Sequence, residues 1–454
     1  MVRTTRVSSM IPAMLAVPAL CFVLASAQQA RATASKHFEP WIGNSIQPAP
    51  AFEPAAVPPT TVQPGDGETE KIYRAALAWF SNGVTRADAL VAPAEAAAER
   101  IIAGGNLYAD GTPGFASEMF GRAGGYGFLR EWSGEPIEAN DVLLIGMMTP
   151  REPNYPHSLT VLSWEGQRQH GQLVHFSSHN WPYVKRTIPT IHPERWGGRL
   201  NLIDTGGPDG SSWSDVSLNQ MSAIATAWAF QGEMFAAGAR QGETLATLAS
   251  NAEPNGRRWD RSVEGLKLHP RFKVPPVPAG KISRDYYLTC RKQLAAFLNA
   301  GEAGQVRRAA ERLARAMRRG NRVFVVISGH FHVLGAIVPQ SFQHRVSLCG
   351  RTWQWHDSVL EKGDVLLDLG YLDYPDKRVS KALAAGAEAV TISVADGPTD
   401  ERRTHIRSHW TDWDSVINVT GYPVRILPSS GVVQIVQWYA LMAETERALA
   451  RLEK

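Results

Sequence analysis

The stretch EANDVLLIG at residues 138–146 recurs later in the chain as EKGDVLLDLG at residues 361–370. In both copies a short polar turn ends in an aspartate and leads into an apolar run that closes on a glycine. An apolar run of this length is typical of a strand that is buried on both faces of a parallel sheet. The pair therefore predicts an α/β protein that contains the same unit twice.

The sequence around each stretch repeats the same order of elements. A helix over residues 308–317 leads through Gly320 to a strand over 322–327, just as a helix ends at Gly104-Gly105 before a strand at 106–109. Helices that alternate with short apolar strands indicate parallel sheets covered on both faces. The remaining predicted elements are helices from about residue 115 and over 377–385, long amphipathic helices over 215–239 and 431–452, and strands over 159–162, 172–176 and 389–393.

Composition is that of a soluble globular protein. The chain has 454 residues, of which 44% are hydrophobic, and its 47 Lys+Arg against 43 Asp+Glu give a formal net charge of +4. These values exclude a disordered chain, a collagen-like fibre and a coiled coil, and they give no reason to expect a nucleic-acid partner.

The expected organisation is a signal peptide at 1–27, a Pro- and Ala-rich linker or strap at 28–67, a first domain at 68–250, a connector at 251–284 and a second domain at 285–454.

The first residues indicate export. Arg3 and Arg6 precede an apolar stretch over residues 10–25, and Ala25-Ser26-Ala27 offers a small-residue cleavage site, which is the pattern of a secretory signal peptide. The apolar stretch is shorter than the roughly 20 residues that a spanning helix needs. We therefore expect an exported protein, periplasmic or secreted, with no membrane span after cleavage. An uncleaved anchor is the alternative.

Two cysteines remain after the signal peptide, Cys290 and Cys349. In an oxidising compartment they either form one disulfide or stay as separate buried thiols, and the sequence leaves both open. Two cysteines so far apart lack the spacing of zinc ligands. The sequence also contains neither a P-loop nor a hydrolase nucleophile elbow. We expect neither a metal nor a cofactor.

Three strings resemble the sugar isomerase (SIS) domain family, which often occurs as tandem copies. They are EMFGRAGG at 118–125, GHFH at 329–332 and LNLIDTGGPDG at 200–210. The resemblance covers most of residues 68–445. It implies two tandem flavodoxin-like doubly wound domains, a carbohydrate derivative as ligand and pairing into a homodimer. In open sheets of this class, ligands bind outside the carboxyl ends of the strands.

The turns at the strand ends supply the predicted binding residues. The phosphate loop of the family is rich in Ser and Thr, whereas this chain has Met147-Met148-Thr149 in one copy and Tyr371-Leu372-Asp373-Tyr374 in the other. The ligand therefore either lacks a phosphate or has its charge met by another group such as Arg151. Ser214 is the predicted N-cap of the long helix, and Ser212 contacts ligand if that helix begins at the cleft. The predicted ligand-binding residues are Thr112, Arg122, Thr149, Arg151, Ser212, Ser328, His332 and Tyr371.

Glu118 and His330 are the predicted catalytic pair. Aldose–ketose isomerisation needs a carboxylate that moves a proton next to a carbonyl, and Glu118 is the best placed candidate. The alternative for Glu118 is an ion pair with Arg122, four residues further along the same helix face. His330 and His332 fit hydrogen bonding to a ligand, base catalysis or, with further ligands, zinc.

Three functions are compatible with these residues. The first is an exported protein that binds a sugar or amino sugar, phosphorylated or not, with reduced or no isomerase activity. The second is an active sugar isomerase or lyase that uses Glu118 and a histidine. The third is a metal-dependent hydrolase built on His330 and His332.

Overall fold

The structure is a computed structural model that describes residues 67–112, 114–148, 170–187, 199–210, 212–329, 346–351, 360–410 and 413–454. The predicted signal peptide, the linker up to residue 66 and the predicted strand over 159–162 lie outside the described residues.

The first half of the chain forms a five-stranded sheet in the order β2-β1-β3-β4-β5, and every strand pair in it is parallel. This is the order of flavodoxin-type doubly wound sheets, in which the strand order reverses between the first and third strands. The elements are α2 (Glu68–Arg86), η1 (Ala87–Leu90), α3 (Val91–Ile102), β1 (Leu107–Gly111), α4 (Phe115–Met119), β2 (Arg130–Glu131), β3 (Val142–Gly146), β4 (Gln172–Ser177), α6 (Pro182–Thr187), β5 (Leu200–Asp204) and α7 (Trp213–Arg240).

The second half repeats this plan in the parallel order β10-β9-β8-β6-β7, which is the same order counted from β6. The predicted pair of doubly wound domains is therefore confirmed. After a connecting segment with α8 (Gly256–Val263), the elements are α9 (Lys281–Asn299), α10 (Glu302–Arg318), β6 (Val323–Ile327), β7 (Val346–Arg351), β8 (Val365–Leu369), α11 (Asp376–Ala384), β9 (Glu388–Ser393), β10 (Arg403–Arg407), the antiparallel pair β11 (Ser415–Ile417) and β12 (Ile426–Pro428), and α12 (Ser430–Leu452).

The repeated aspartate explains why the two opening stretches look alike. Asp141 accepts hydrogen bonds from the backbone N–H groups of Asn106 at 2.7 Å and Glu138 at 3.0 Å. Asp364 accepts the equivalent bonds from Arg322 at 3.0 Å and Glu361 at 2.9 Å. Each carboxylate thus closes the turn before β3 or β8 and ties it to the start of the neighbouring strand. The turn fixes the register in which these two strands pair.

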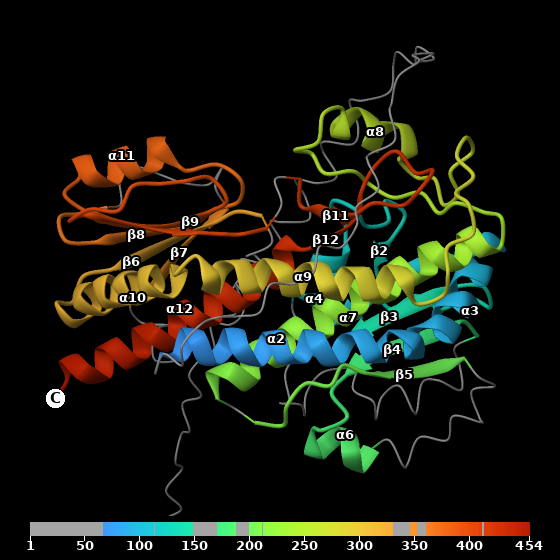
Figure 1. Cartoon of the computed structure of the whole chain (residues 1–454), viewed down its shortest axis with the longest axis horizontal. Coiled ribbons are helices and arrows are strands. Elements are labelled where there is room, and N and C mark those ends of the chain that lie inside the picture. The colour runs from blue at the N-terminus through green and yellow to red at the C-terminus, as the bar shows by residue number, and fades with distance from the viewer. Residues whose placement is uncertain are drawn as a thin grey trace, which may run out of the picture. The chain divides into compact units, whose positions relative to one another are not determined.

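The two domains meet through four helices whose contacts are equivalent when the halves are exchanged. Helix α2 contacts its counterpart α9, α7 contacts its counterpart α12, and the contact of α2 with α12 is matched by that of α9 with α7. Figure 1 shows these four helices crossing between the two sheets. Such a self-complementary interface is that of a symmetric dimer, here formed within one chain.

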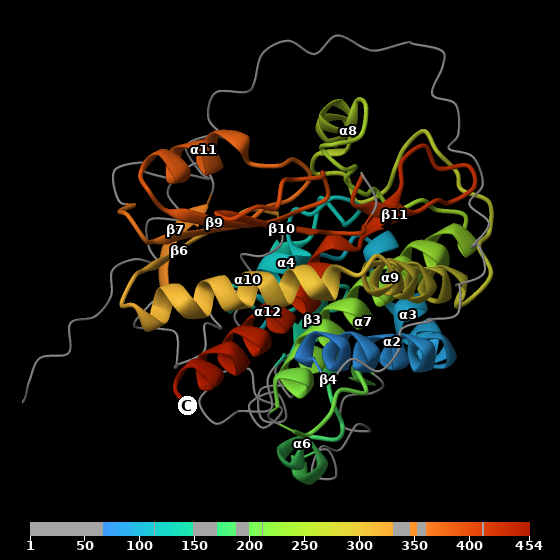
Figure 2. The ribbon, with the colours of Figure 1, turned by 60° about the vertical axis from the view of Figure 1, so that its left-hand side comes forward.

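Both long helices are buried almost all round, which corrects the amphipathic pattern predicted for them. Residues 217–239 of α7 are buried apart from Leu218, and residues 430–445 of α12 are all buried. Each helix covers its own sheet on one side and meets the other domain on the opposite side. One hydrophobic cluster consequently runs through both domains, while smaller clusters lie under α6 and α11 on the outer faces. Figure 2 shows α11 on one face of the second sheet and α10 on the other.

Two local predictions also have clear outcomes. The N-cap of α7 is Ser212 and not Ser214, because Ser212 accepts from the N–H of Asp215 in a reciprocal capping box.

Cys290 is a free, buried thiol, and burial raises its pKa well above the usual range. The disulfide alternative for Cys290 is therefore not formed in this structure.

We expect Asp141→Ala to lower the free energy of unfolding by about 3 kcal/mol, because two backbone donors lose a charged acceptor. Asp209→Ala, at an exposed loop position, serves as the control and should change stability by less than about 0.5 kcal/mol. Urea titration measures both. Equal stability of the two variants would show that the Asp141 turn does not hold the strands together.

Candidate functional site

Glu118 lies in α4, the short helix that follows β1, and its side chain is completely buried. The indole N–H of Trp228 in α7 donates to its Oε1 at 3.3 Å. Arg122 Nε lies 3.9 Å from its Oε2, so the predicted ion pair is present. The two residues do not share a helix face as predicted, because α4 ends at Met119. A desolvated carboxylate with a cationic neighbour is thus built into the end of the first strand.

The Glu118 carboxylate packs against the first turn of α12, which belongs to the second domain. A Cβ atom placed on Gly431 would lie 2.1 Å from Oε1 of Glu118, so any other residue here would force the buried carboxylate to shift. The N-terminus of a helix carries partial positive charge and favours a nearby anion. The end of a second-domain helix therefore stabilises a first-domain carboxylate.

The second domain adds three polar groups at the same place. Tyr371, in the loop after β8, donates its hydroxyl hydrogen bond to Asp414, whose other oxygen accepts from the N–H of Ser430 at 3.0 Å. Burial raises the pKa of Tyr371 well above its usual value, the negative charge of Asp414 raises it further, and the charge of Arg122 opposes both. Arg122 of the first domain therefore lies close enough to Tyr371 of the second for its charge to act on the hydroxyl. We call Glu118, Arg122, Tyr371, Asp414 and Ser430 the junction cluster.

Of the strand ends predicted to bind ligand, the end of β6 lies beside this cluster. Ser328 donates its hydroxyl to the carbonyl of Leu369 at 3.0 Å, and Gly329 packs against the Tyr371 ring. Thr112, at the end of β1, accepts from the N–H of Met148 at 3.0 Å. These positions are the points in each sheet where the strand order reverses, between β1 and β3 and between β6 and β8.

Other predicted residues are not brought to the junction cluster. Ser212 begins α7, and its neighbour Trp213 donates to Glu446 near the far end of α12, whereas the cluster lies at the start of α12. The hydroxyl of Ser212 is also already engaged, because it donates to Asp215 at 2.6 Å. The predicted residues His330, His332, Thr149 and Arg151 lie outside the described residues.

The sequence did not point to Asp414 or Ser430 of the junction cluster, nor to Trp228, whose indole N–H donates to Glu118. The signal that was available is Ser429-Ser430-Gly431, a second polar helix start equivalent to the Ser-rich start of α7. The GRAGG string has its own structural reason at Gly124, which has a φ of 74°. A Cβ there would lie 2.4 Å from the backbone nitrogen of Leu427, so the string marks where β12 docks on the first domain.

A separate pocket of about 420 Å³ lies along β5. Arg86, His179, Asn201 and Asp204 supply polar groups to its lining, together with Tyr287 from α9. Arg86 Nη2, His179 Nε2 and Asn201 Nδ2 have no hydrogen-bond partner among the parts of the chain that the structure describes. Burial lowers the pKa of His179, although Asp204 opposes the shift. This pocket is the second place where a polar ligand would find partners.

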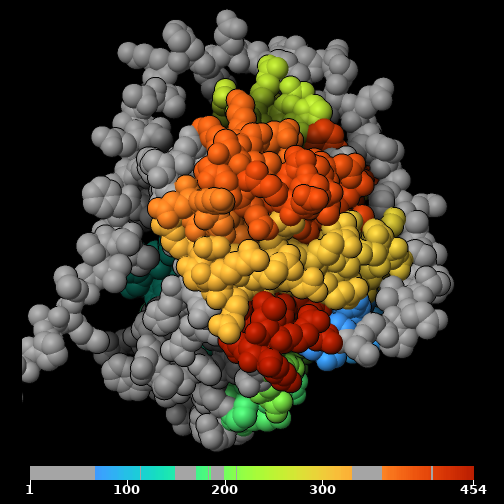
Figure 3. Space-filling view, turned by 90° about the vertical axis from the view of Figure 1, so that its left-hand side faces the viewer, coloured from blue at the N-terminus to red at the C-terminus, as the bar shows by residue number. Residues whose placement is uncertain are grey.

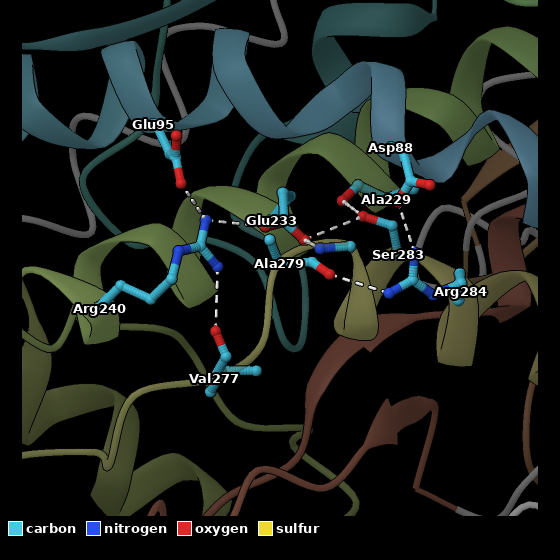
Figure 4. Close-up of polar contacts among 10 residues, drawn as sticks. Asp88, Glu95, Ala229, Glu233, Arg240, Val277, Ala279, Ser283 and Arg284 are labelled. Atoms are coloured by element: carbon cyan, nitrogen blue, oxygen red, sulfur yellow. Dashed lines mark hydrogen bonds and ion pairs between the residues drawn. The ribbon is translucent and has the colours of Figure 1, made fainter.

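A further buried carboxylate, Glu233 in α7, is occupied by structural contacts (Figure 4). One oxygen accepts from Arg240 at 3.0 Å and the other from the N–H of Gly280 at 3.0 Å. Arg240 also reaches Glu95 at 2.9 Å and the carbonyl of Val277 at 3.0 Å. Burial raises the pKa of Glu233, and its hydrogen bonds oppose the shift. The network fastens α7 to α3 and to the segment that leads into α9.

Compared with models of known protein families and with curated proteins, the sequence matches none of them. The two strand orders make the chain a doubly wound α/β protein. Among the described residues, no group of three or more His, Cys, Asp or Glu side chains is arranged to hold a metal ion.

We expect Gly431→Ala to lower the free energy of unfolding by about 2 kcal/mol, because the new methyl group overlaps Glu118. In a Glu118→Gly background, which removes the overlapped carboxylate, the same substitution should cost much less than it does in the wild type. Gly304→Ala in α10 is the matched control, since its Cβ meets nothing within 4 Å and alanine favours a helix. Additive effects of the two junction substitutions would disprove the contact.

Stability should fall as the pH is lowered, with His175 as a main contributor. This histidine is completely buried in β4, and burial lowers its pKa to about 3, against about 6.5 in an unfolded chain. The unfolded state therefore binds more protons between these two values, so stability is lost as the pH falls through that window, by up to about 5 kcal/mol. His175→Phe should flatten the dependence in urea titrations across the window, while His170→Gln, at an exposed position, should not.

Proposed function

We propose that the chain is an exported tandem sugar-isomerase-like protein that binds a carbohydrate derivative at the junction cluster. The observation that carries the proposal is the convergence of both domains on one place. Helix α4 after β1 and the loop after β8, each at the reversal of strand order, bring Glu118 and Tyr371 to the start of α12. Ligands of doubly wound proteins bind at such reversal points.

The chemistry of the cluster supports a ligand rich in hydroxyl groups. Glu118 and Asp414 are fully buried and already accept from protein donors, so a ligand binds here by replacing one of those donors. Sugar hydroxyls are hydrogen-bond donors that carboxylates accept. Two carboxylates at one place also disfavour a phosphate there, in agreement with the sequence of the phosphate loops. The resemblance to sugar isomerase domains and the predicted signal peptide support the ligand class and the export.

Residual isomerase activity is the second candidate, favoured by a buried carboxylate, Glu118, at the same junction as the Tyr371 hydroxyl. Moving a proton between two sugar carbons requires a carboxylate base within reach of an acid. Glu118 is the base in this scheme, and the Tyr371 hydroxyl is a proton-transferring group on the other domain.

A thermal-shift screen with glucose, glucosamine and N-acetylglucosamine, each with and without a 6-phosphate, tests the proposal. We expect at least one unphosphorylated sugar to stabilise the protein, by about 2.7 kcal/mol when present at a hundred times its dissociation constant. Glu118→Gln should raise the sugar concentration needed for the same stabilisation at least tenfold. Glu99→Gln, on the exposed side of α3, should leave that concentration unchanged.

Two outcomes would contradict this proposal. One is the absence of stabilisation by every sugar tested. The other is a response that Arg86→Gln abolishes and Glu118→Gln leaves intact, which would place the ligand in the pocket along β5. Exchange of the C2 hydrogen of a bound sugar in heavy water, present in the wild type and lost in Glu118→Gln, would identify an active isomerase.

A further inference from the structure

Helix α10 carries a row of arginines on its outward side. Arg308, Arg315, Arg318 and Arg319 are all exposed. At 100° per residue they fall, together with Glu311, within an arc of about 100°. The opposite side of α10 packs against α12 and β10. We call the four arginines the basic stripe, and Figure 3 shows the yellow ridge that contains α10 lying open on this face of the molecule.

The duplicated fold provides a comparison for the stripe, because α3 is the counterpart of α10. The two helices end in the same way: the N–H of Ala103 bonds to the carbonyl of Glu99, and that of Arg319 bonds to the carbonyl of Arg315. When the two helices are aligned on these ends, none of the four α3 residues that correspond to the stripe is basic. The counterparts of Arg308, Arg315, Arg318 and Arg319 are Ala92, Glu99, Ile102 and Ala103.

The stripe does not serve the stability of the fold. Arg315 lies three and four residues before Arg318 and Arg319, and like charges at these spacings destabilise a helix. Among the described residues, the side chains of Arg315, Arg318 and Arg319 have neither an ion-pair nor a hydrogen-bond partner. Arg322, just beyond the helix, differs because it pairs with Asp364 at 2.7 Å. Arg308 donates to Oε1 of Gln305 at 3.1 Å, an uncharged partner that does not neutralise it. The stripe is therefore an excess of positive charge that is available to a partner.

We propose that the basic stripe docks the protein on an anionic phospholipid membrane. Guanidinium groups bind phosphate oxygens through paired hydrogen bonds. From Arg308 to Arg319 the stripe runs for about 17 Å along a convex helix, which suits a plane of head groups. The apolar side of α10 is already engaged by α12, so the contact is peripheral and electrostatic. Among the described residues, no helix is both long and apolar enough to cross a bilayer.

Vesicle co-sedimentation of the purified full chain tests this. We expect binding to phosphatidylcholine vesicles that contain about one third phosphatidylglycerol, and loss of that binding as the salt concentration is raised well above physiological strength, where the Debye length falls toward about 3 Å. The triple substitution Arg315→Gln, Arg318→Gln, Arg319→Gln should lower partitioning about 100-fold. Its melting temperature should equal or exceed that of the wild type, since repulsion is removed.

The matched control removes the same charge elsewhere, with Arg257→Gln, Arg261→Gln and Arg271→Gln at exposed positions in and after α8. This control variant should keep most of the wild-type binding to the anionic vesicles. Equal losses in the two triple variants, or wild-type binding to pure phosphatidylcholine, would overturn the proposal. Stripe-dependent binding to duplex DNA without binding to anionic vesicles would also overturn it and would identify nucleic acid as the partner.

Discussion

The shared layer of four helices is the constraint on which the rest of this structure depends. Helices α7 and α12 are buried on nearly all sides because each belongs to the cores of both domains. A helix that is apolar all round is stable only when every side is covered. Neither domain can supply that cover alone, so the two units are held as one body by the same hydrophobic burial that stabilises each sheet.

The helix layer also determines where chemistry can occur. Packing α12 across the junction brings its first turn against Glu118, which lies far away in the sequence, and the same approach places Tyr371 in the field of Arg122. The junction cluster is therefore a property of the pair of domains. Glycine at position 431 makes the approach possible, since any side chain there would overlap the carboxylate.

The two halves share a scaffold but differ where a ligand or partner would meet them. The start of α7 is closed by its own capping box, whereas the start of α12 is held by carboxylates from elsewhere, Asp414 and Glu118. On the outside, α10 carries four exposed arginines at positions where α3 has none. The two halves are equivalent in the core, where their helices pack against each other. They differ at the surfaces that we propose to be functional.

The sequence by itself determined the features that depend on neighbours along the chain. The aspartate turns before β3 and β8 and the pair of Glu118 with Arg122 are contacts whose spacing is visible in the residues. Burial of both faces of α7 was not visible, because an apolar residue does not reveal which domain will cover it.

The tertiary structure alone decided the partners of Glu118. Trp228 and Gly431 come from segments more than a hundred residues away, and no local pattern links them to α4. Only the closing of the two domains brings these groups together. The sequence thus determined the repeated unit, and the packing of one copy against the other decided the candidate site, because long-range contacts depend on the whole fold.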